Sequence, residues 1–201
     1  MLTSRPLLSA ALLLLLVATP GTAASLSTGE PAPNFTLPDT SGAEHSLEDF
    51  RGKYVVLEWL NHGCPFVRAH YGAGNLQALQ ERWTDEGVVW LSIVSSAPGK
   101  QGHHPPTEAD RLTEEKGAAP TAVLLDPEGE VGRAYAARTT PHMFVIGPEG
   151  TLLYQGALDD DPRVRAPRAA TNYVTAALES ARSGETVAVD ATRPYGCSVK
   201  Y

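Results

Sequence analysis

Two stretches of the chain are almost continuously apolar, which is typical of strands covered on both faces of a sheet. They are residues 53–60, KYVVLEWL, and residues 88–95, VVWLSIVS. Shorter runs predict strands at 34–37, 121–125, 143–146 and 151–154. The last two are joined only by the turn Gly-Pro-Glu-Gly, so they are expected to pair as an antiparallel hairpin.

Apolar residues at helical spacing lie between these strands. Pro65 directly follows Cys64, and proline is favoured at the first helical position, so we expect Cys64 to cap a helix. Further helical segments are predicted as one turn at 46–50, a helix that ends near Thr84, a short helix that starts with a capping box at Thr107, a short helix at 131–137, and an amphipathic helix from Ala170 that ends at Gly184.

The order of these elements restricts the fold. It reads strand, helix, strand, inserted helix and strand, helix, hairpin, helix. A parallel pair followed by an antiparallel hairpin, with helices in between, predicts an α/β fold with a mixed central sheet and helices on both faces.

The N-terminal segment has the features of a secretory signal peptide. Arg5 is followed by an apolar run from Leu7 to Ala18 and then by small residues up to Ala24. Because this run is shorter than a membrane-spanning helix requires, we expect residues 1–24 to be cleaved. The prediction is one domain over 25–201 with a tail from about 185, periplasmic or secreted, without membrane insertion after cleavage.

Charge and cysteine count narrow the function classes. The formal net charge of −7 argues against nucleic acid and anionic membranes as partners. Two cysteines are too few for a disulfide scaffold in a chain of 201 residues. Export would place both where a disulfide can persist.

Cys64 is the main candidate for chemistry. A thiolate is the reactive form of cysteine, and the unpaired amides and positive dipole end of a helix N-terminus favour that anion. Arg68, one turn further on, is expected to add positive charge. The alternatives are a buried, inert cysteine or a purely structural disulfide.

The element order, the cysteine at the start of the first long helix, and Thr140-Pro141 before the hairpin resemble the thioredoxin superfamily. Within it, the chain looks like the redoxin branch related to alkyl hydroperoxide reductase and thiol-specific antioxidant proteins. The segments that carry this likeness are Gly29–Asp39, Asn61–Tyr71, Thr140–Gly150 and Gly156–Asp160, and the closing Arg193–Tyr201 resembles the tail of exported peroxiredoxin-like redoxins.

Several positions depart from the family patterns. Val67 stands where thioredoxins carry their second cysteine, so a dithiol cycle within that turn is ruled out. Leu57 and Asn61 occupy the positions of the peroxiredoxin Pro and Thr, and Pro141 lies near the position of the peroxiredoxin Arg. Asn61 is the candidate to supply a hydrogen bond in place of that Thr.

The resemblance implies roles for further residues. Glu58 has the offset of the buried acid of thioredoxins and would shuttle protons if burial raises its pKa, or else pair with a cation. Thr140 and Pro141 correspond to the cis-proline site, and with Pro65 and Phe66 they are expected to bind substrate.

Cys197 has two possible roles. The tail that carries it contains Pro194 and Gly196 and could swing Cys197 back over the helix terminus. Cys197 would then resolve a sulfenic acid or mixed disulfide on Cys64. The alternative is a permanent staple worth about 4 to 5 kcal/mol in the chain-entropy model.

No cofactor or metal is expected. His62, Cys64 and His70 lie near one another in the sequence, but they lack the close ligand pairs of structural metal sites. The three acidic residues at 159–161 and the arginines at 163, 165 and 168 are expected to form a solvated loop with local ion pairs.

The sequence therefore predicts an exported thiol-dependent oxidoreductase. Its substrate would be a protein or small-molecule thiol or disulfide, or a peroxide, and an external thiol reductant would reset it. The rival interpretation is a non-catalytic protein-binding module of the same fold, stapled by Cys64 and Cys197.

Overall fold

The structure is a computed structural model that describes residues 26–201. The predicted signal peptide, residues 1–24, lies outside the described residues. Among the helices described, none is long and apolar enough to cross a membrane.

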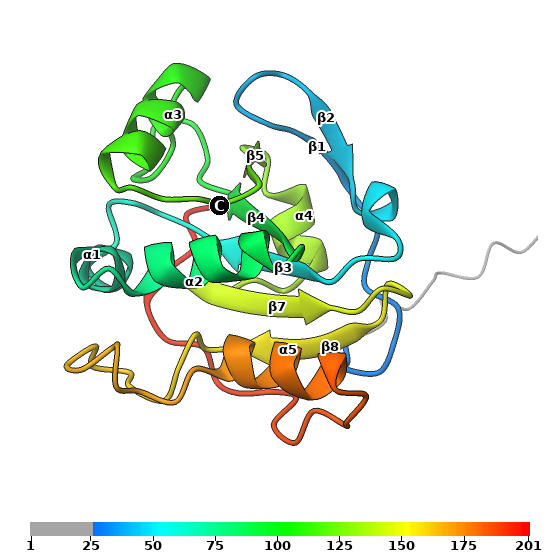
Figure 1. The fold of residues 1–201 in the computed structure, drawn as a ribbon. Coiled ribbons are helices and arrows are strands. Elements are labelled where there is room, and N and C mark those ends of the chain that lie inside the picture. Colours follow the sequence, from blue (N-terminus) through cyan, green and yellow to red (C-terminus); the bar gives the residue numbers. More distant parts are fainter. Residues whose placement is uncertain (1–25) are drawn as a thin grey trace, which may run out of the picture.

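The core is a five-stranded sheet in the order β5-β4-β3-β7-β8 (Figure 1). Its central strand β3 runs parallel to β4, and β4 runs parallel to β5. On its other side β3 pairs antiparallel with β7, and β7 with β8. The bounds are β3 (Val55–Trp59), β4 (Val89–Val94), β5 (Ala122–Leu125), β7 (His142–Ile146) and β8 (Leu152–Gly156). The predicted mixed sheet is confirmed.

Helices cover both faces of the sheet, as predicted. The helices α1 (Pro65–Gly72), α2 (Asn75–Asp85) and α5 (Tyr173–Arg182) pack on one face, and α4 (Glu130–Ala134) lies on the other (Figure 1). Successive residues of β3 pack on opposite faces of the sheet. Val56 belongs to the core cluster under α1, α2 and α5, whereas Leu57 belongs to the core cluster on the other face. This alternation follows from the two-residue period of a strand.

The inserted unit contains one correction. It consists of α3 (Pro106–Glu115) and β5, and the helix begins before Thr107. Pro105 is the N-cap residue and no side chain caps the helix end, so the predicted capping box at Thr107 is wrong. Proline presets the helical φ angle at the first position, which explains why the helix begins at Pro106.

The segment before the sheet contains the predicted first strand and a partner that the sequence pattern did not indicate. The strand β1 (Thr36–Pro38) pairs antiparallel with β2 (Glu44–Ser46). The predicted helical turn follows as η1 (Leu47–Phe50).

The C-terminal tail is held along its length, which the sequence pattern did not predict. The first part of the tail runs alongside β8, where the Thr192 amide donates to the Gln155 carbonyl. Its end forms β9 (Cys197–Ser198), which pairs antiparallel with β6 (Thr139–Thr140), and the Val199 amide donates to the Arg138 carbonyl. In Figure 1 the tail, in red, passes on the side of the molecule where α1 lies.

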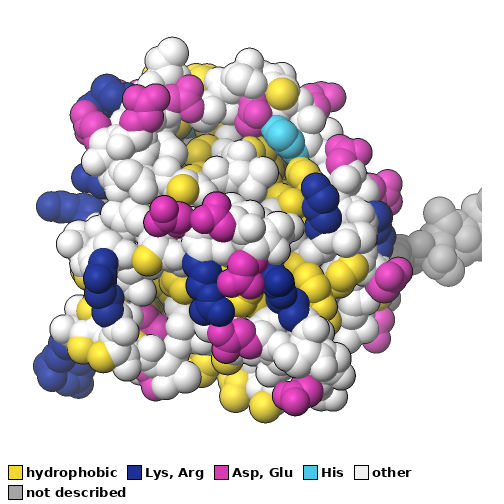
Figure 2. All heavy atoms as spheres, viewed as in Figure 1, with side chains coloured by type: hydrophobic (Ala, Val, Ile, Leu, Met, Phe, Trp, Pro, Cys, Tyr) yellow, Lys and Arg dark blue, Asp and Glu magenta, His cyan; other side chains and the backbone are white. Residues whose placement is uncertain are grey.

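Charges of both signs are mixed on the face formed by α2 and α5. Figure 2 shows acidic and basic side chains interspersed over these helices. Arg82 on α2 pairs with Glu86 and with Glu179 on α5, and Arg182 pairs with Glu86. This face therefore carries no uniform field of one sign.

Candidate active site

Cys64 lies at the N-terminus of α1, as predicted. It is the N-cap residue, and Pro65 occupies the first helical position. The Cys64 amide donates to the Asn61 carbonyl at 2.9 Å, and its thiol donates to the Thr140 carbonyl at 3.0 Å. The side chain is fully buried. The nucleophile candidate is thus fixed between α1 and the segment that precedes β7.

Two opposing influences set the protonation of Cys64. Burial is the largest and raises the pKa of the thiol, because a buried anion loses its hydration. The side chain of Cys197, the amides of Val67 and Cys197, and the side chain of Thr140 all lower the pKa. Their combined effect leaves the pKa of Cys64 below its usual value.

The Thr140 hydroxyl is placed to stabilise a thiolate. It is buried, and in the thiol state it has no hydrogen-bond partner among the described residues. A buried donor without an acceptor costs free energy, and ionisation of Cys64 supplies an anionic acceptor beside it.

Cys197 is brought to Cys64 by backbone pairing. The β6–β9 register sets Cys197 opposite Thr140, whose carbonyl also accepts from the Cys64 thiol. Burial raises the pKa of Cys197 to about 11, and the proximity of Cys64 adds to this. Both cysteines are free in this structure. Of the pair, Cys64 is therefore the one that ionises first.

Gly196 permits this close approach. Its φ of +134° and its backbone position place an imagined Cβ 2.1 Å from the Thr140 carbonyl oxygen. Any other residue would collide with the segment that Cys197 must pair with. Only glycine lets the tail lie this close to Thr140.

The Thr140–Pro141 peptide bond is cis, and β9 of the tail pairs with the two residues before Pro141. With both cysteines reduced, the tail therefore occupies the backbone edge of β6 next to the cis-proline. Pro65 is exposed, and the ring of Phe66 lies 6.0 Å from that of Tyr195 in the tail.

The sequence predicts that Asn61 supplies a hydrogen bond at Cys64 and that Arg68 adds positive charge there. The Asn61 side chain is buried, accepts from the Gly63 amide at 2.8 Å and donates to the Gln101 carbonyl at 3.2 Å. It therefore holds the loop before Cys64. Arg68 is exposed and is not among the groups that shift the pKa of Cys64, so its charge contribution stays a prediction.

Glu58 lies buried under α2. Burial, the largest influence, raises the pKa of its carboxyl, whereas hydrogen bonds that it accepts from Trp90, Gln80 and Ser92 lower the pKa. All three partners are neutral, so the alternative of a carboxylate paired with a cation does not describe it. Its role in proton transfer stays a prediction.

The acidic loop after β8 is exposed at Asp160 and at the three arginines, as predicted, but Asp159 departs from the prediction. Asp159 is buried and accepts a hydrogen bond from the Tyr195 hydroxyl. Asp161 accepts from the backbone amides of Arg163, Arg165 and Ala166, so these bonds replace the expected ion pairs. The reason is local: backbone amides that follow an Asp within a few residues are its nearest donors.

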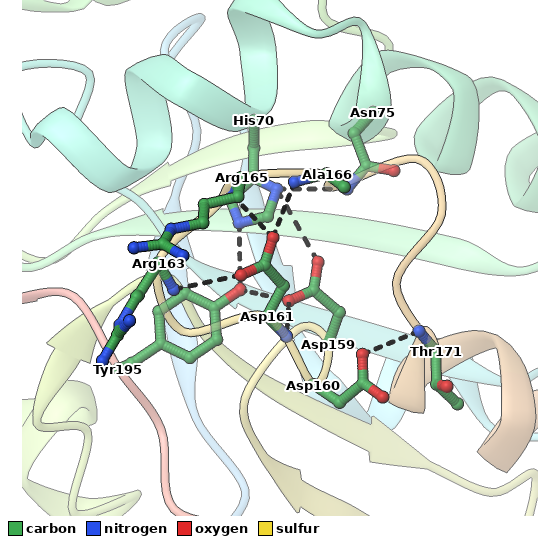
Figure 3. A network of polar contacts seen from close by, with 10 residues as sticks. All are labelled: His70, Asn75, Asp159, Asp160, Asp161, Arg163, Arg165, Ala166, Thr171 and Tyr195. Carbon is green, nitrogen blue, oxygen red and sulfur yellow. Dashed lines mark hydrogen bonds and ion pairs between the residues drawn. The ribbon is translucent and has the colours of Figure 1, made fainter.

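Figure 3 shows a buried polar cluster around Tyr195 that sequence reasoning missed. It joins His70 on α1 to Asp159 and to the tail. The available signal was Tyr195 itself, an aromatic residue two positions before Cys197 in the tail.

For metals, no group of three or more His, Cys, Asp or Glu able to hold an ion occurs within residues 26–201.

Comparison with known sequences and structures gives one family. The AhpC/TSA family matches residues 28–155. Thiol-disulfide oxidoreductase ResA of Geobacillus kaustophilus is 30% identical over 119 residues, which cover 53% of this chain and 68% of that protein. A Mycobacterium tuberculosis protein classed with the peroxiredoxins is 25% identical over 143 residues, 69% of this chain and 82% of that protein.

Solved structures agree with the fold. A conserved protein of Geobacillus kaustophilus, named as uncharacterized, has a TM-score of 0.75 at 27% identity and covers 87% of this chain and 92% of its own. The thioredoxin domain of a thiol-disulfide oxidoreductase from Bacteroides vulgatus has a TM-score of 0.52 at 25% identity, over 65% of this chain and 89% of that one. The predicted thioredoxin-like fold and redoxin resemblance are confirmed.

The Thr140 hydroxyl should be required for full ionisation of Cys64. We expect Thr140→Val to lower the rate of Cys64 alkylation by iodoacetamide at pH 7 on the order of threefold to tenfold, because the thiolate loses a donor. The rate is measured against pH, in a range where Cys197, with its pKa of about 11, stays protonated. Thr139→Val is the matched control, because its hydroxyl donates to the Pro141 carbonyl. An unchanged pH profile in Thr140→Val would refute the role of this hydroxyl.

Gly196→Ala should separate the tail from Thr140. The added Cβ meets the Thr140 carbonyl oxygen, so we expect Cys64–Cys197 disulfide formation under mild oxidant to slow by about tenfold or more while the domain stays folded. Gly184→Ala is the control: Gly184 also has a positive φ, but no atom lies within 4 Å of its imagined Cβ. Equal disulfide formation in both variants would contradict the close approach.

Proposed function

The chain belongs to the AhpC/TSA family, and we propose that it works as a thiol-dependent oxidoreductase that uses Cys64 and Cys197 in one cycle. The observation that carries the proposal is the register of β6 with β9. It sets Cys197 opposite Thr140, whose carbonyl accepts from the Cys64 thiol. In this proposal Cys64 is the nucleophile and Cys197 the resolving cysteine.

The first step is attack on a disulfide. The Cys64 thiolate attacks one sulfur of the substrate disulfide, a Cys64–substrate disulfide forms, and the other substrate sulfur leaves as a thiolate that takes up a proton. The lowered pKa of Cys64 supports its role as attacker, and the raised pKa of Cys197 keeps that thiol protonated until it is needed. Glu58 is the proposed group that gives and takes protons, because burial raises the pKa of its carboxyl and so favours the protonated form.

The second step closes the intramolecular disulfide. Cys197 loses its proton and attacks the Cys64 sulfur, the Cys64–Cys197 bond forms, the Cys64–substrate bond breaks, and the second substrate sulfur leaves as a thiolate that takes up the proton released by Cys197. The substrate is reduced by two electrons and the pair is oxidised by two. An external thiol reductant then reopens the pair and resets the cycle.

The proposed substrate surface surrounds Cys64. Thr140 and Pro141 border it on the sheet side, and Pro65 and Phe66 on the helix side. Because the tail pairs with β6, a polypeptide substrate that uses the same edge must first displace β9.

We also propose that the protein acts outside the cytoplasm, periplasmic or secreted, which rests on the signal peptide predicted for residues 1–24.

Peroxide reduction is the second candidate. The family match favours it, and the resolving cysteine comes from the tail, far in the sequence from the helix that carries the nucleophile. Here the thiolate would attack a peroxide oxygen to give a sulfenic acid and an alcohol or water, and Cys197 would then expel water. Stopped-flow oxidation of Cys197→Ser by hydrogen peroxide decides this, because a rate no faster than that of a small free thiol rejects it.

The two cysteines should give different products with 5,5′-dithiobis(2-nitrobenzoate). Reduced wild type is expected to release two nitrothiobenzoate ions per chain and to end as the intramolecular disulfide. Cys197→Ser should release one and keep a mixed disulfide that intact-mass analysis detects. Cys64→Ser should react about 100-fold more slowly or worse near neutral pH, because burial, the largest cause of the raised pKa of Cys197, remains in this variant and keeps the remaining thiol protonated.

Two results would overturn this assignment. One is a stable mixed disulfide on the wild type, and the other is Cys64→Ser reacting as fast as Cys197→Ser. A glutathione titration of the wild-type pair separates the cycle from a permanent staple in a non-catalytic binding module. A potential below about −300 mV identifies the staple.

A further inference from the structure

The tail is anchored two residues before Cys197 by a side chain that reaches into the protein. The Tyr195 hydroxyl donates to Asp159 Oδ1 at 2.5 Å and lies 3.1 Å from His70 Nε2 (Figure 3). His70 is fully buried and Asp159 is 1% exposed. The hydroxyl of a tail residue therefore enters a closed polar cluster rather than solvent.

The hydrogen bonds of this cluster have one consistent direction. The Asn75 side-chain amide lies 3.1 Å from His70 Nδ1 and can only donate, so Nδ1 accepts. His70 Nε2 then carries the proton and donates to the Tyr195 oxygen, which leaves the Tyr195 proton for Asp159. The hydrogen bonds therefore form one chain that leads from Asn75 on α2 through His70 on α1 and Tyr195 in the tail to the carboxylate of Asp159. In such a chain each hydrogen bond strengthens the next.

The charge states fit this direction. Burial lowers the pKa of His70 to about 4, so the ring is neutral at pH 7. Asp161 favours the protonated ring, but its carboxylate is occupied by the backbone amides of its own loop. Loss of the Tyr195 hydroxyl would remove a partner from both buried side chains, which is costly because neither reaches water.

The same helix carries the anchor and the nucleophile. Cys64 is the N-cap of α1, and His70 lies in the last turn of that helix. The Tyr195 ring also packs 6.0 Å from Phe66, centroid to centroid. The tail is therefore fixed to α1 at Tyr195 and to β6 at Cys197, with Gly196 as the only residue between them.

We propose that Tyr195 is a positioning residue for the second step, whose hydroxyl, held by His70 and Asp159, keeps Cys197 against Cys64 and keeps the tail closed over Cys64. This deepens the proposed function and rests on it. Cys64 is completely buried, and Cys197 of the tail packs against the cluster that contains it, so the same anchor should hinder the first step. Its loss should therefore move the two steps in opposite directions.

Tyr195→Phe tests this, because it keeps the ring contacts with Phe66 and His70 and removes only the hydroxyl. In a Cys197→Ser background we expect the limiting rate of Cys64 alkylation by iodoacetamide, reached at high pH where the thiolate is fully formed, to become severalfold faster, so that any change in the pKa of Cys64 does not enter the comparison. In the two-cysteine protein we expect the equilibrium constant for closing Cys64–Cys197 in a glutathione buffer to fall about tenfold. For a two-electron couple this raises the reduction potential by about 30 mV.

Tyr54→Phe is the matched control for stability. Its hydroxyl donates to the Ala181 carbonyl at 3.0 Å, at the end of α5, so its loss costs a comparable hydrogen bond away from the tail. The alkylation rate and the reduction potential should both stay at the wild-type values there. A purely structural role for Tyr195 predicts that Tyr195→Phe behaves like this control, and that result overturns the proposal.

A second variant keeps the test decisive if Tyr195→Phe fails to fold. Asp159→Asn keeps an acceptor oxygen for Tyr195 but removes the charge, so it should change both readouts in the same directions by less. The proposal is also overturned if Tyr195→Phe lowers both the alkylation rate and the equilibrium constant for closing the disulfide. If wild type itself closes no intramolecular disulfide, the proposed cycle fails, whereas a closing wild type with an unaffected Tyr195→Phe refutes only the role of Tyr195.

Discussion

The antiparallel pairing of β6 with β9 is the interaction on which the site depends. It consists of a few backbone contacts between Arg138–Thr140 and Cys197–Val199, yet it joins two cysteines that lie far apart in the sequence. Without it the other contacts of the tail would remain, but nothing would set Cys197 opposite Thr140 and so beside Cys64. The close backbone approach at Gly196 and the anchor at Tyr195 both serve this pairing.

The helix N-terminus alone does not account for a reactive Cys64. Burial raises its pKa, and a thiolate sealed in apolar packing would be disfavoured. Ionisation is favoured because polar groups from three places converge on one sulfur: the Val67 amide of α1, the Thr140 side chain of β6, and Cys197 of the tail. The tail therefore packs against the cluster that contains Cys64 and supplies part of what lowers the pKa of the Cys64 thiol.

The sequence predicted what periodicity and local capping determine. The buried strands at 53–60 and 88–95, the hairpin and the helix that begins at Pro65 all follow from apolar runs and one proline, and their order predicted a mixed α/β sheet. The thioredoxin-like fold was implied by the resemblance that this order shares with Cys64 and Thr140-Pro141. The two-residue strands β6 and β9 could not be found in this way, because so short a segment has no period. Asp159 was misread for a related reason: its burial comes from Tyr195, a tertiary partner that no local pattern reveals.

The position of the tail in the reduced protein can be measured most directly by hydrogen exchange at the Val199 amide. This amide donates to the Arg138 carbonyl at 3.0 Å, beside the β6–β9 pair. With both cysteines reduced, protection of this amide well above the rate of an unstructured peptide is predicted. Exchange at the unstructured rate in the reduced protein would contradict a tail that holds Cys197 at Cys64.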